Sequence, residues 1–116
     1  MQVLVDTSIW IDHFRKKNPE LVALLEQNLA LTHSAVIGEL ACGNLKRRTE
    51  ILAYLELLPE AQEAISHEVL QMIELRHLYG KGLNWVDAQL LASAYLSNVR
   101  LWTNDRQLGR YTEKRF

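Results

Sequence analysis

The 116-residue sequence predicts an α/β fold, a sandwich of helices around a short, mostly parallel β-sheet. Two observations predict it. Short apolar runs rich in β-branched residues alternate with segments whose apolar residues recur at helical spacing. The length is sufficient for one domain with a real core, and no linker, repeat or low-complexity tract divides it. We therefore expect a single domain over residues 1–116.

The first half of the chain begins with a strand. Val3-Leu4-Val5 is an apolar run typical of a strand buried on both faces, and it ends at Asp6. A helix is expected over 7–14, and a second begins at Asn18-Pro19, because proline is favoured at the first helical position. The other elements of this half are a short strand over 29–32 and helices over 34–45 and 48–58.

The second half adds two strands and three helices. Ala64-Ile65-Ser66 predicts a short third strand, and a helix over 67–79 follows it until Gly80-Lys81-Gly82 ends it. Asn84 begins the next helix. The chain closes with a strand over 99–103 and a short helix over 104–110. Alternation of strands and helices is what favours parallel pairing.

Composition narrows the class of protein. The formal net charge of −1 excludes a general polyanion binder. Cys42 is the single cysteine, so no internal disulfide forms, which fits a reducing compartment. Met1-Gln2 leads directly into the first strand without a signal peptide, and no apolar stretch approaches the ~18 residues of a membrane helix. We expect a cytoplasmic protein with no membrane partner.

Two of the four aspartates follow predicted strands. Asp6 comes directly after the first strand, and Asp105 comes two residues after the last, which ends at Thr103. If both strands are parallel and central, both carboxylates emerge at the edge of the sheet where open α/β folds bind ligands. Asp6 is also a favoured residue type for the N-cap of the next helix, so a purely structural role stays open.

Two further acids lie on predicted helices. Asp87 lies three residues after Asn84, the spacing of a capping box. It is also aligned with the apolar stripe of its helix, which consists of Leu90, Leu91, Ala94 and Tyr95. Glu39 has only small residues at the neighbouring helical positions, which leaves space beside its carboxylate: Ala35, Cys42 and Gly43.

A divalent cation would relieve the repulsion among four carboxylates at one edge. Oxygen ligands suit Mg²⁺ or Mn²⁺, whereas zinc prefers His or Cys, and the four histidines show no metal-ligand spacing. A carboxylate-bound metal is suited to hydrolysis at phosphorus. We therefore predict a catalytic metal site formed by Asp6, Glu39, Asp87 and Asp105. Flanking polar residues are placed to hold the ligands or their waters: Ser8, Thr103 and Asn104.

The order of these acids resembles that of the PIN domain. The matching motifs are Val-Asp6-Thr-Ser near the start, Glu39 in an early helix, Asp87 in Trp-Val-Asp-Ala-Gln-Leu-Leu-Ala, and Thr103-Asn104-Asp105. Among PIN proteins the sequence is most similar to VapC, the toxin of a bacterial type II toxin–antitoxin pair. The resemblance implies a PIN-like sandwich and a Mg²⁺- or Mn²⁺-dependent endoribonuclease that cleaves structured RNA. It also implies neutralisation by a VapB-like antitoxin, and commonly a toxin homodimer.

Two alternatives stay open beside this assignment. Gln107 stands where many relatives have a further acid. Asp105 is therefore either a direct metal ligand or a residue that holds a ligand in place without touching the metal. If the acids are only helix caps, the chain is a non-catalytic module that acts through a partner. A phosphatase with an aspartyl-phosphate is disfavoured, because Ser8 occupies the position two residues after Asp6 where such enzymes need a second acid.

Basic residues follow two of the acids along the chain. If they hold backbone phosphates near the acids, RNA binding will depend on salt concentration. Solvated helix ends are the alternative explanation for such clusters. The residues are Lys46, Arg47 and Arg48 after Glu39, and Arg106, Arg110, Lys114 and Arg115 after Asp105.

Overall fold

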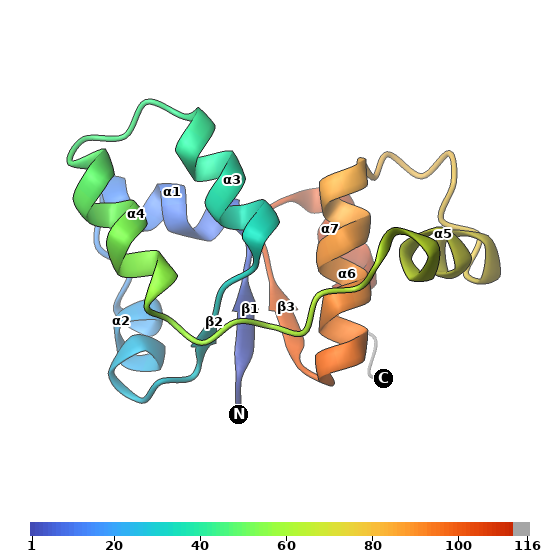
Figure 1. Ribbon diagram of the computed structural model, residues 1–116, viewed down its shortest axis with the longest axis horizontal. Helices are drawn as coiled ribbons and strands as arrows, with labels where there is room; N and C mark the ends of the chain where they lie inside the picture. The colour runs from blue at the N-terminus through green and yellow to red at the C-terminus, as the bar shows by residue number, and fades with distance from the viewer. Residues whose placement is uncertain (113–116) are drawn as a thin grey trace.

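The computed structural model describes residues 1–112 and places seven helices around a three-stranded parallel sheet, which confirms the predicted α/β class (Figure 1). In chain order the elements are β1 (Val3–Val5), α1 (Thr7–Arg15), α2 (Pro19–Glu26), β2 (Ala30–Leu31), α3 (Ser34–Cys42), α4 (Arg48–Glu56), α5 (Ser66–Leu75), α6 (Trp85–Ser97), β3 (Arg100–Trp102) and α7 (Arg106–Thr112). Over these residues, no helix is long and apolar enough to cross a membrane.

The strand order β2-β1-β3 places β1 at the centre of the sheet. Leu4 of β1 pairs with Leu31 on one side and with Leu101 on the other, and both pairings are parallel. The carboxyl ends of the strands therefore meet at one edge, which is the upper edge of the sheet in Figure 1. Whatever residues follow the strands are brought together there.

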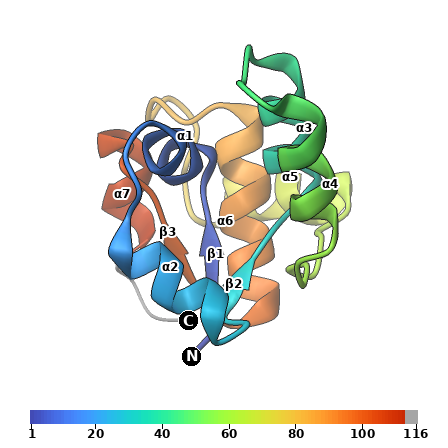
Figure 2. The same ribbon diagram turned by 90° about the vertical axis from the view of Figure 1, so that its left-hand side faces the viewer.

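Helices cover both faces of this small sheet. In Figure 2, α1, α2 and α7 lie to the left of the strands, while α6 and the helices α3 to α5 lie to the right. The core is apolar and contains large, fully buried side chains from both layers, among them Trp10, Leu90, Leu91, Leu101 and Leu108. Full burial of each leucine contributes roughly 1.5–3 kcal/mol, so this packing is a main source of the stability of the fold.

The strand predicted over 64–66 is wrong. Ser66 is the first residue of α5, and Ile65 is 65% exposed, so this segment has no sheet to pair with. Glu68 Oε1 accepts a hydrogen bond from Ile65 N at 3.0 Å, which satisfies the start of a helix instead. The additional strand-like contact lies nearby, as a single parallel bridge between Thr32 and Glu60.

The helix predicted over 67–79 is shorter in the structure. α5 ends at Leu75, and His77 adopts a left-handed backbone conformation with φ of 53°, which interrupts the helical hydrogen bonds. The loop from this point to Asn84 then carries the chain to the start of α6. A glycine is required within it, because Gly82 has φ of 83°.

Candidate active site

Asp6 lies at the centre of the carboxyl edge, directly after β1, and is only 6% exposed. Its backbone N–H donates to Trp102 O at 2.9 Å, which continues the pairing with β3 by one residue. Asp6 occupies the N-cap position of α1, as the structural alternative predicts, but its side chain makes no capping hydrogen bond. The carboxylate is therefore held by other groups.

Two hydroxyl groups hold the Asp6 carboxylate. Ser8 Oγ donates to Asp6 Oδ2 at 2.8 Å, and Thr103 Oγ1 donates to the same oxygen at 2.7 Å. Each hydroxyl in turn accepts a backbone N–H that follows β3, Ser8 Oγ from Asn104 N and Thr103 Oγ1 from Asp105 N, both at 3.0 Å. Because each hydroxyl has one proton, these bonds direct both donors toward Asp6 Oδ2.

Asp87 combines the two roles that the sequence left open. It forms the capping box, in which Asn84 N donates to Asp87 Oδ2 at 3.1 Å and Asp87 N donates to Asn84 Oδ1 at 2.8 Å. Burial raises the pKa of Asp87, the hydrogen bond from Asn84 N opposes that rise, and repulsion from three other acids adds to it: Asp105, Asp6 and Glu39. The same four carboxylates that the sequence singles out therefore share one electrostatic environment.

Glu39 projects from α3 and is exposed at the surface. Thr7 Oγ1, at the start of α1, donates to Glu39 Oε1 at 2.6 Å. Two of the small neighbours predicted beside it, Cys42 and Gly43, are exposed as well. Glu39 is thus attached to the first turn of the helix that follows Asp6.

Asp105 is the N-cap of α7, since its Oδ2 accepts a hydrogen bond from Leu108 N at 2.8 Å. Gln107, which stands in place of a further acid, is turned toward the loop before α6. A Cβ added at Gly82 would lie 3.3 Å from Gln107 Cδ, so glycine allows this close approach. The alternative of helix capping is therefore confirmed for Asp105 and Asp87, and wrong for the side chain of Asp6.

The four acids have one feature in common beyond their position. Each uses one carboxylate oxygen to accept from the protein, and within residues 1–112 no protein donor bonds the second oxygen. Oxygen-only donors of this kind fit Mg²⁺ or Mn²⁺. Over the same described residues, no three His, Cys, Asp or Glu side chains lie close enough to enclose an ion as they stand. The donor chemistry fits such a cation, and the carboxylates are spaced more widely than in a closed site.

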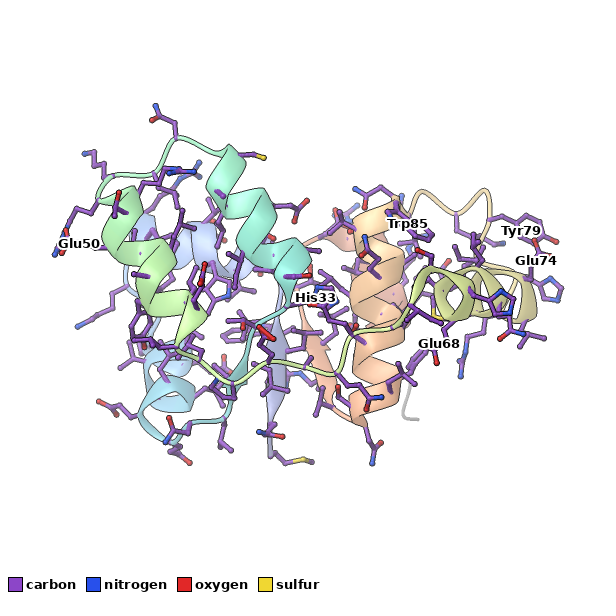
Figure 3. The ribbon with its side chains drawn as sticks, in the orientation of Figure 1. His33, Glu50, Glu68, Glu74, Tyr79 and Trp85 are labelled. Atoms are coloured by element: carbon purple, nitrogen blue, oxygen red, sulfur yellow. The ribbon has the colours of Figure 1, made fainter. Side chains whose placement is uncertain are left out.

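The basic residues after Glu39 differ in whether their side chains already bond other groups of the protein. Arg47 pairs with Glu50 at 2.8 Å, an ion pair at the outer surface of α4 near the Glu50 label of Figure 3. Arg48 donates twice to Ala41 O and so closes the end of α3. Lys46 lines an open groove of about 1070 Å³ between α1, α3 and α4, which Glu39 also lines.

The remaining basic residues of the prediction lie on or beyond α7. Arg106 and Arg110 are exposed on that helix. Lys114 and Arg115 lie outside the described residues. The sequence did not single out Arg15 and Lys17, although both line the groove together with Lys46.

Two contacts of the site escaped prediction from the sequence. Thr7 lies within the Val-Asp6-Thr-Ser motif, which predicts no contact for it, but it is the partner of Glu39. The sequence indicates no role for Asp12, whose Oδ2 accepts a hydrogen bond from Asn104 Nδ2 at 2.6 Å. Asn104 thus ties the end of β3 to α1 from both its backbone and its side chain. The only available signal was helical spacing, since Asp12 lies one turn beyond Ser8.

Comparison with known proteins agrees with this arrangement. Residues 3–114 match the model of the PIN domain family. The chain is also 44% identical over 107 residues to proteins named Ribonuclease VapC32 from two strains of Mycobacterium tuberculosis, an alignment that covers 91% of this chain and 86% of each relative. The chain therefore belongs to the PIN domain family, and its similarity to VapC proteins confirms the family that the order of its acids predicts.

Proposed function

We propose that this chain is a Mg²⁺- or Mn²⁺-dependent endoribonuclease that hydrolyses a phosphodiester in structured RNA. Asp6, Glu39, Asp87 and Asp105 are its catalytic, metal-binding acids. The observation that carries the proposal is that each of these acids leaves one carboxylate oxygen without a protein donor within residues 1–112, while three of them repel the ionised form of Asp87 and add to the rise that burial causes in its pKa. Such repulsion is a cost to the folded protein that a bound cation would remove.

The enzyme class has independent support. A relative named a ribonuclease, at 44% identity over 91% of this chain, confirms the prediction of ribonuclease activity. PIN nucleases are generally metal-dependent. The identity of the metal, the number of ions and the particular RNA belong to the proposal.

The residues of the chain divide the work at this edge. Asp6, held by Ser8 and Thr103, offers Oδ1 from a nearly buried and fixed position. Asn104, fixed by Ser8 and Asp12, supports that network from the end of β3. A cation bound by the acids would supply charge stabilisation and an activated water for displacement at phosphorus.

Residues near the acids supply candidate contacts to RNA phosphates. Lys46 lines the groove beside Glu39, whereas Arg47 and Arg48 already bond Glu50 and Ala41. Arg106 and Arg110 extend the basic surface on the other side, along α7. We propose that Lys46, Arg106 and Arg110 make the main contacts to RNA phosphates. Arg47 and Arg48 contribute less to RNA binding.

The groove between α1, α3 and α4 also fits a protein segment. Glu39 lines it, together with the basic residues. Its apolar lining consists of Ile11, Phe14, Ile51 and Tyr54. A segment of a VapB-like antitoxin held there would cover Glu39 and keep RNA out. Finding a short antitoxin-like reading frame directly upstream of the gene, whose co-expression relieves growth arrest, would support this partner.

Exposed apolar side chains on α5 and the loop after it support the proposed homodimer. Leu75 is 79% exposed, Tyr79 59% and Trp85 44%; in Figure 3 Tyr79 lies beside α5 and Trp85 at the start of α6. Large exposed apolar residues gathered on one surface are typical of an interface. Light scattering after size exclusion would give twice the monomer mass for the wild type and less for Leu75→Glu.

A partner-binding module without catalysis is the second candidate. It is favoured by Asp87 and Asp105, which both cap helices. A metal titration separates the two candidates, because a protein whose acids are only caps gains no thermal stability from Mg²⁺ or Mn²⁺.

RNA cleavage with and without metal tests the proposed function. We expect the wild type to cleave structured RNA with Mg²⁺ or Mn²⁺ and to lose activity with a chelator. Asp6→Asn, which keeps the shape of the side chain, should lower cleavage by about a thousandfold and relieve growth arrest. Glu26→Gln, at the exposed end of α2, is the matched control and should keep full activity. Full activity of Asp6→Asn, or activity indifferent to the chelator, would overturn the proposal.

A further inference from the structure

His33 lies at the same carboxyl edge of the sheet as Asp6. It comes two residues after the end of β2 and is the N-cap of α3. It is 1% exposed. Its Nδ1 accepts a hydrogen bond from Ala35 N at 2.9 Å, which satisfies one of the free N–H groups at the start of α3. An imidazole ring thus does the capping that a serine or aspartate side chain usually does.

The other ring nitrogen reaches a different helix. His33 Nε2 lies 2.9 Å from Ser93 Oγ, and Ser93 is completely buried in α6. Figure 3 shows His33 between the start of α3 and α6. Because Nδ1 accepts from Ala35 N, the proton of the neutral ring is on Nε2, and Nε2–H donates to Ser93. Both nitrogens are therefore committed, one to each helix.

The neutral state that this bonding needs is consistent with the surroundings of the ring. Burial lowers the pKa of His33, and the nearby carboxylates of Glu63 and Glu60 oppose that effect without reversing it. Glu63 Oε2 is itself bonded to Ser34 N at 3.1 Å, so it also holds the start of α3. The ring is a fixed structural connection at neutral pH.

The two helices that His33 connects carry the two acids that do not follow a strand. Glu39 lies six residues after His33 on α3, and Asp87 lies six residues before Ser93 on α6. Six residues correspond to roughly 9 Å of helix. The contact between the helices is thus less than two turns from both carboxylates. Helices have no backbone hydrogen bonds to each other, so their spacing is set by side chains.

We propose that His33 and Ser93 form a positioning pair, which holds α3 against α6 and thereby sets the spacing of Glu39 and Asp87 for one cation. The inference rests on the proposed function, because it assigns a role in binding the metal. Strand residues need no such device, since the sheet already aligns Asp6 with Thr103.

Two substitutions remove the connection from opposite sides. Ser93→Ala deletes the acceptor and keeps the His33 cap of α3. His33→Asn keeps a capping oxygen for Ala35 N, because asparagine is a favoured N-cap, but its side chain is too short to reach Ser93. Asn18→Ala is the matched control, since Asn18 Oδ1 caps α2 through Leu21 N at 3.1 Å and α2 carries none of the four acids.

The measurement is the affinity for Mn²⁺, followed by the loss of the free-ion electron paramagnetic resonance signal, with Tm recorded in parallel without metal. We expect each pair variant to bind Mn²⁺ about tenfold more weakly. This is the smallest loss of metal affinity typical of residues that support metal ligands. The double variant should be no weaker than either single one, because both remove the same bond. Asn18→Ala should lower Tm and leave the Mn²⁺ affinity unchanged.

The outcomes separate this inference from the function on which it rests. If the wild type binds no Mn²⁺, the proposed function fails and the inference fails with it. If the wild type binds Mn²⁺ and the pair variants lower Tm but bind the ion equally well, the pair is only structural and the inference alone is overturned. Should His33→Asn fail to fold, Ser93→Ala decides the question, because alanine is well tolerated inside a helix.

Discussion

Asp6 and Glu39 lie at the same edge of the sheet but are held by different kinds of structure. Asp6 follows the central strand, is 6% exposed, and accepts from two hydroxyl groups that the backbone after β3 holds in place. Glu39 extends from a helix surface and accepts a single hydroxyl, from Thr7. The strand side of the edge is fixed by sheet pairing, whereas the helix side depends on individual side-chain bonds.

The difference shows that strand pairing positions one part of the site and helix packing the other. Pairing of β1 with β3 aligns Asp6 and Thr103 without any further device. Glu39 and Asp87 are placed by the packing of α3 against α6, where a small shift of one helix moves its acid relative to the strand side.

The largest expected effect contrasts the two sides directly. Asp6→Asn should lower RNA cleavage by about a thousandfold, because loss of metal-derived charge stabilisation costs several kcal/mol. Glu39→Gln should cost less, about 10- to 100-fold, since its side chain is exposed and less fixed. Single-turnover cleavage at saturating Mg²⁺ would measure both. Equal losses of cleavage rate would show that Asp6 and Glu39 contribute equally to the metal site.

The supporting hydroxyls extend the comparison at smaller magnitude. Thr103→Val removes one of two donors to Asp6 and leaves Asp105 N without its acceptor, so we expect the Mg²⁺ concentration at half-maximal activity to rise about 10- to 100-fold. Thr7→Val removes the donor to Glu39, and we expect a rise below about tenfold. Both changes preserve side-chain shape. Thr49→Val, at an exposed position of α4, should change nothing.

These contacts also show how far the sequence could predict the site. Asp6, Ser8 and Thr103 were predictable together, because residues that follow parallel strands meet at one edge. The bond between Thr7 and Glu39 was not, since it joins residues 32 positions apart through the packing of two helices. Helical periodicity identifies which face is buried, but it does not determine which helices face each other.

The errors in the predicted elements have a local cause. Ala64-Ile65-Ser66 has strand-like composition, but three residues contain too little information to outweigh a helix start at Ser66 supported by Glu68. The capping box of Asp87 was predicted from the spacing to Asn84 and is confirmed. His33 shows the limit most clearly, because its partner Ser93 is 60 residues away.

A smaller effect is expected from the basic residues of the helix side. Lys46→Gln should weaken RNA binding about two- to fivefold and lower the slope of affinity against salt by about one, as loss of one phosphate contact does. Arg48→Gln is the internal control, because Arg48 is bonded to Ala41 O and should affect Tm more than RNA. Binding would be measured by fluorescence anisotropy in the Asp6→Asn background. An equal slope change for both variants would contradict the assignment.

The smallest expected effect lies in the stability of the protein without metal. The folded-state pKa of Asp87 is raised, mainly by burial and then by the neighbouring acids, so the folded protein holds this proton more tightly than the unfolded chain does. Its stabilising contribution is present below the ordinary aspartate pKa and is lost as pH rises through the raised value. At neutral pH the ionised side chain therefore destabilises the fold.

Asp87→Asn should accordingly raise Tm at pH 7 by a few degrees, since asparagine keeps an oxygen for Asn84 N and removes the charge. The gain should shrink as pH falls through the raised pKa, because the wild-type carboxyl is then neutral as well. Adding Mn²⁺ should reverse the order, because the cation stabilises the wild type and finds one ligand fewer in the variant. Thermal unfolding at several pH values, with and without Mn²⁺, measures all three changes. A variant less stable than the wild type at pH 7 without metal would mean that Asp87 acts in folding chiefly as a cap, and the helix side would then lack the repulsion that distinguishes it from an ordinary helix start.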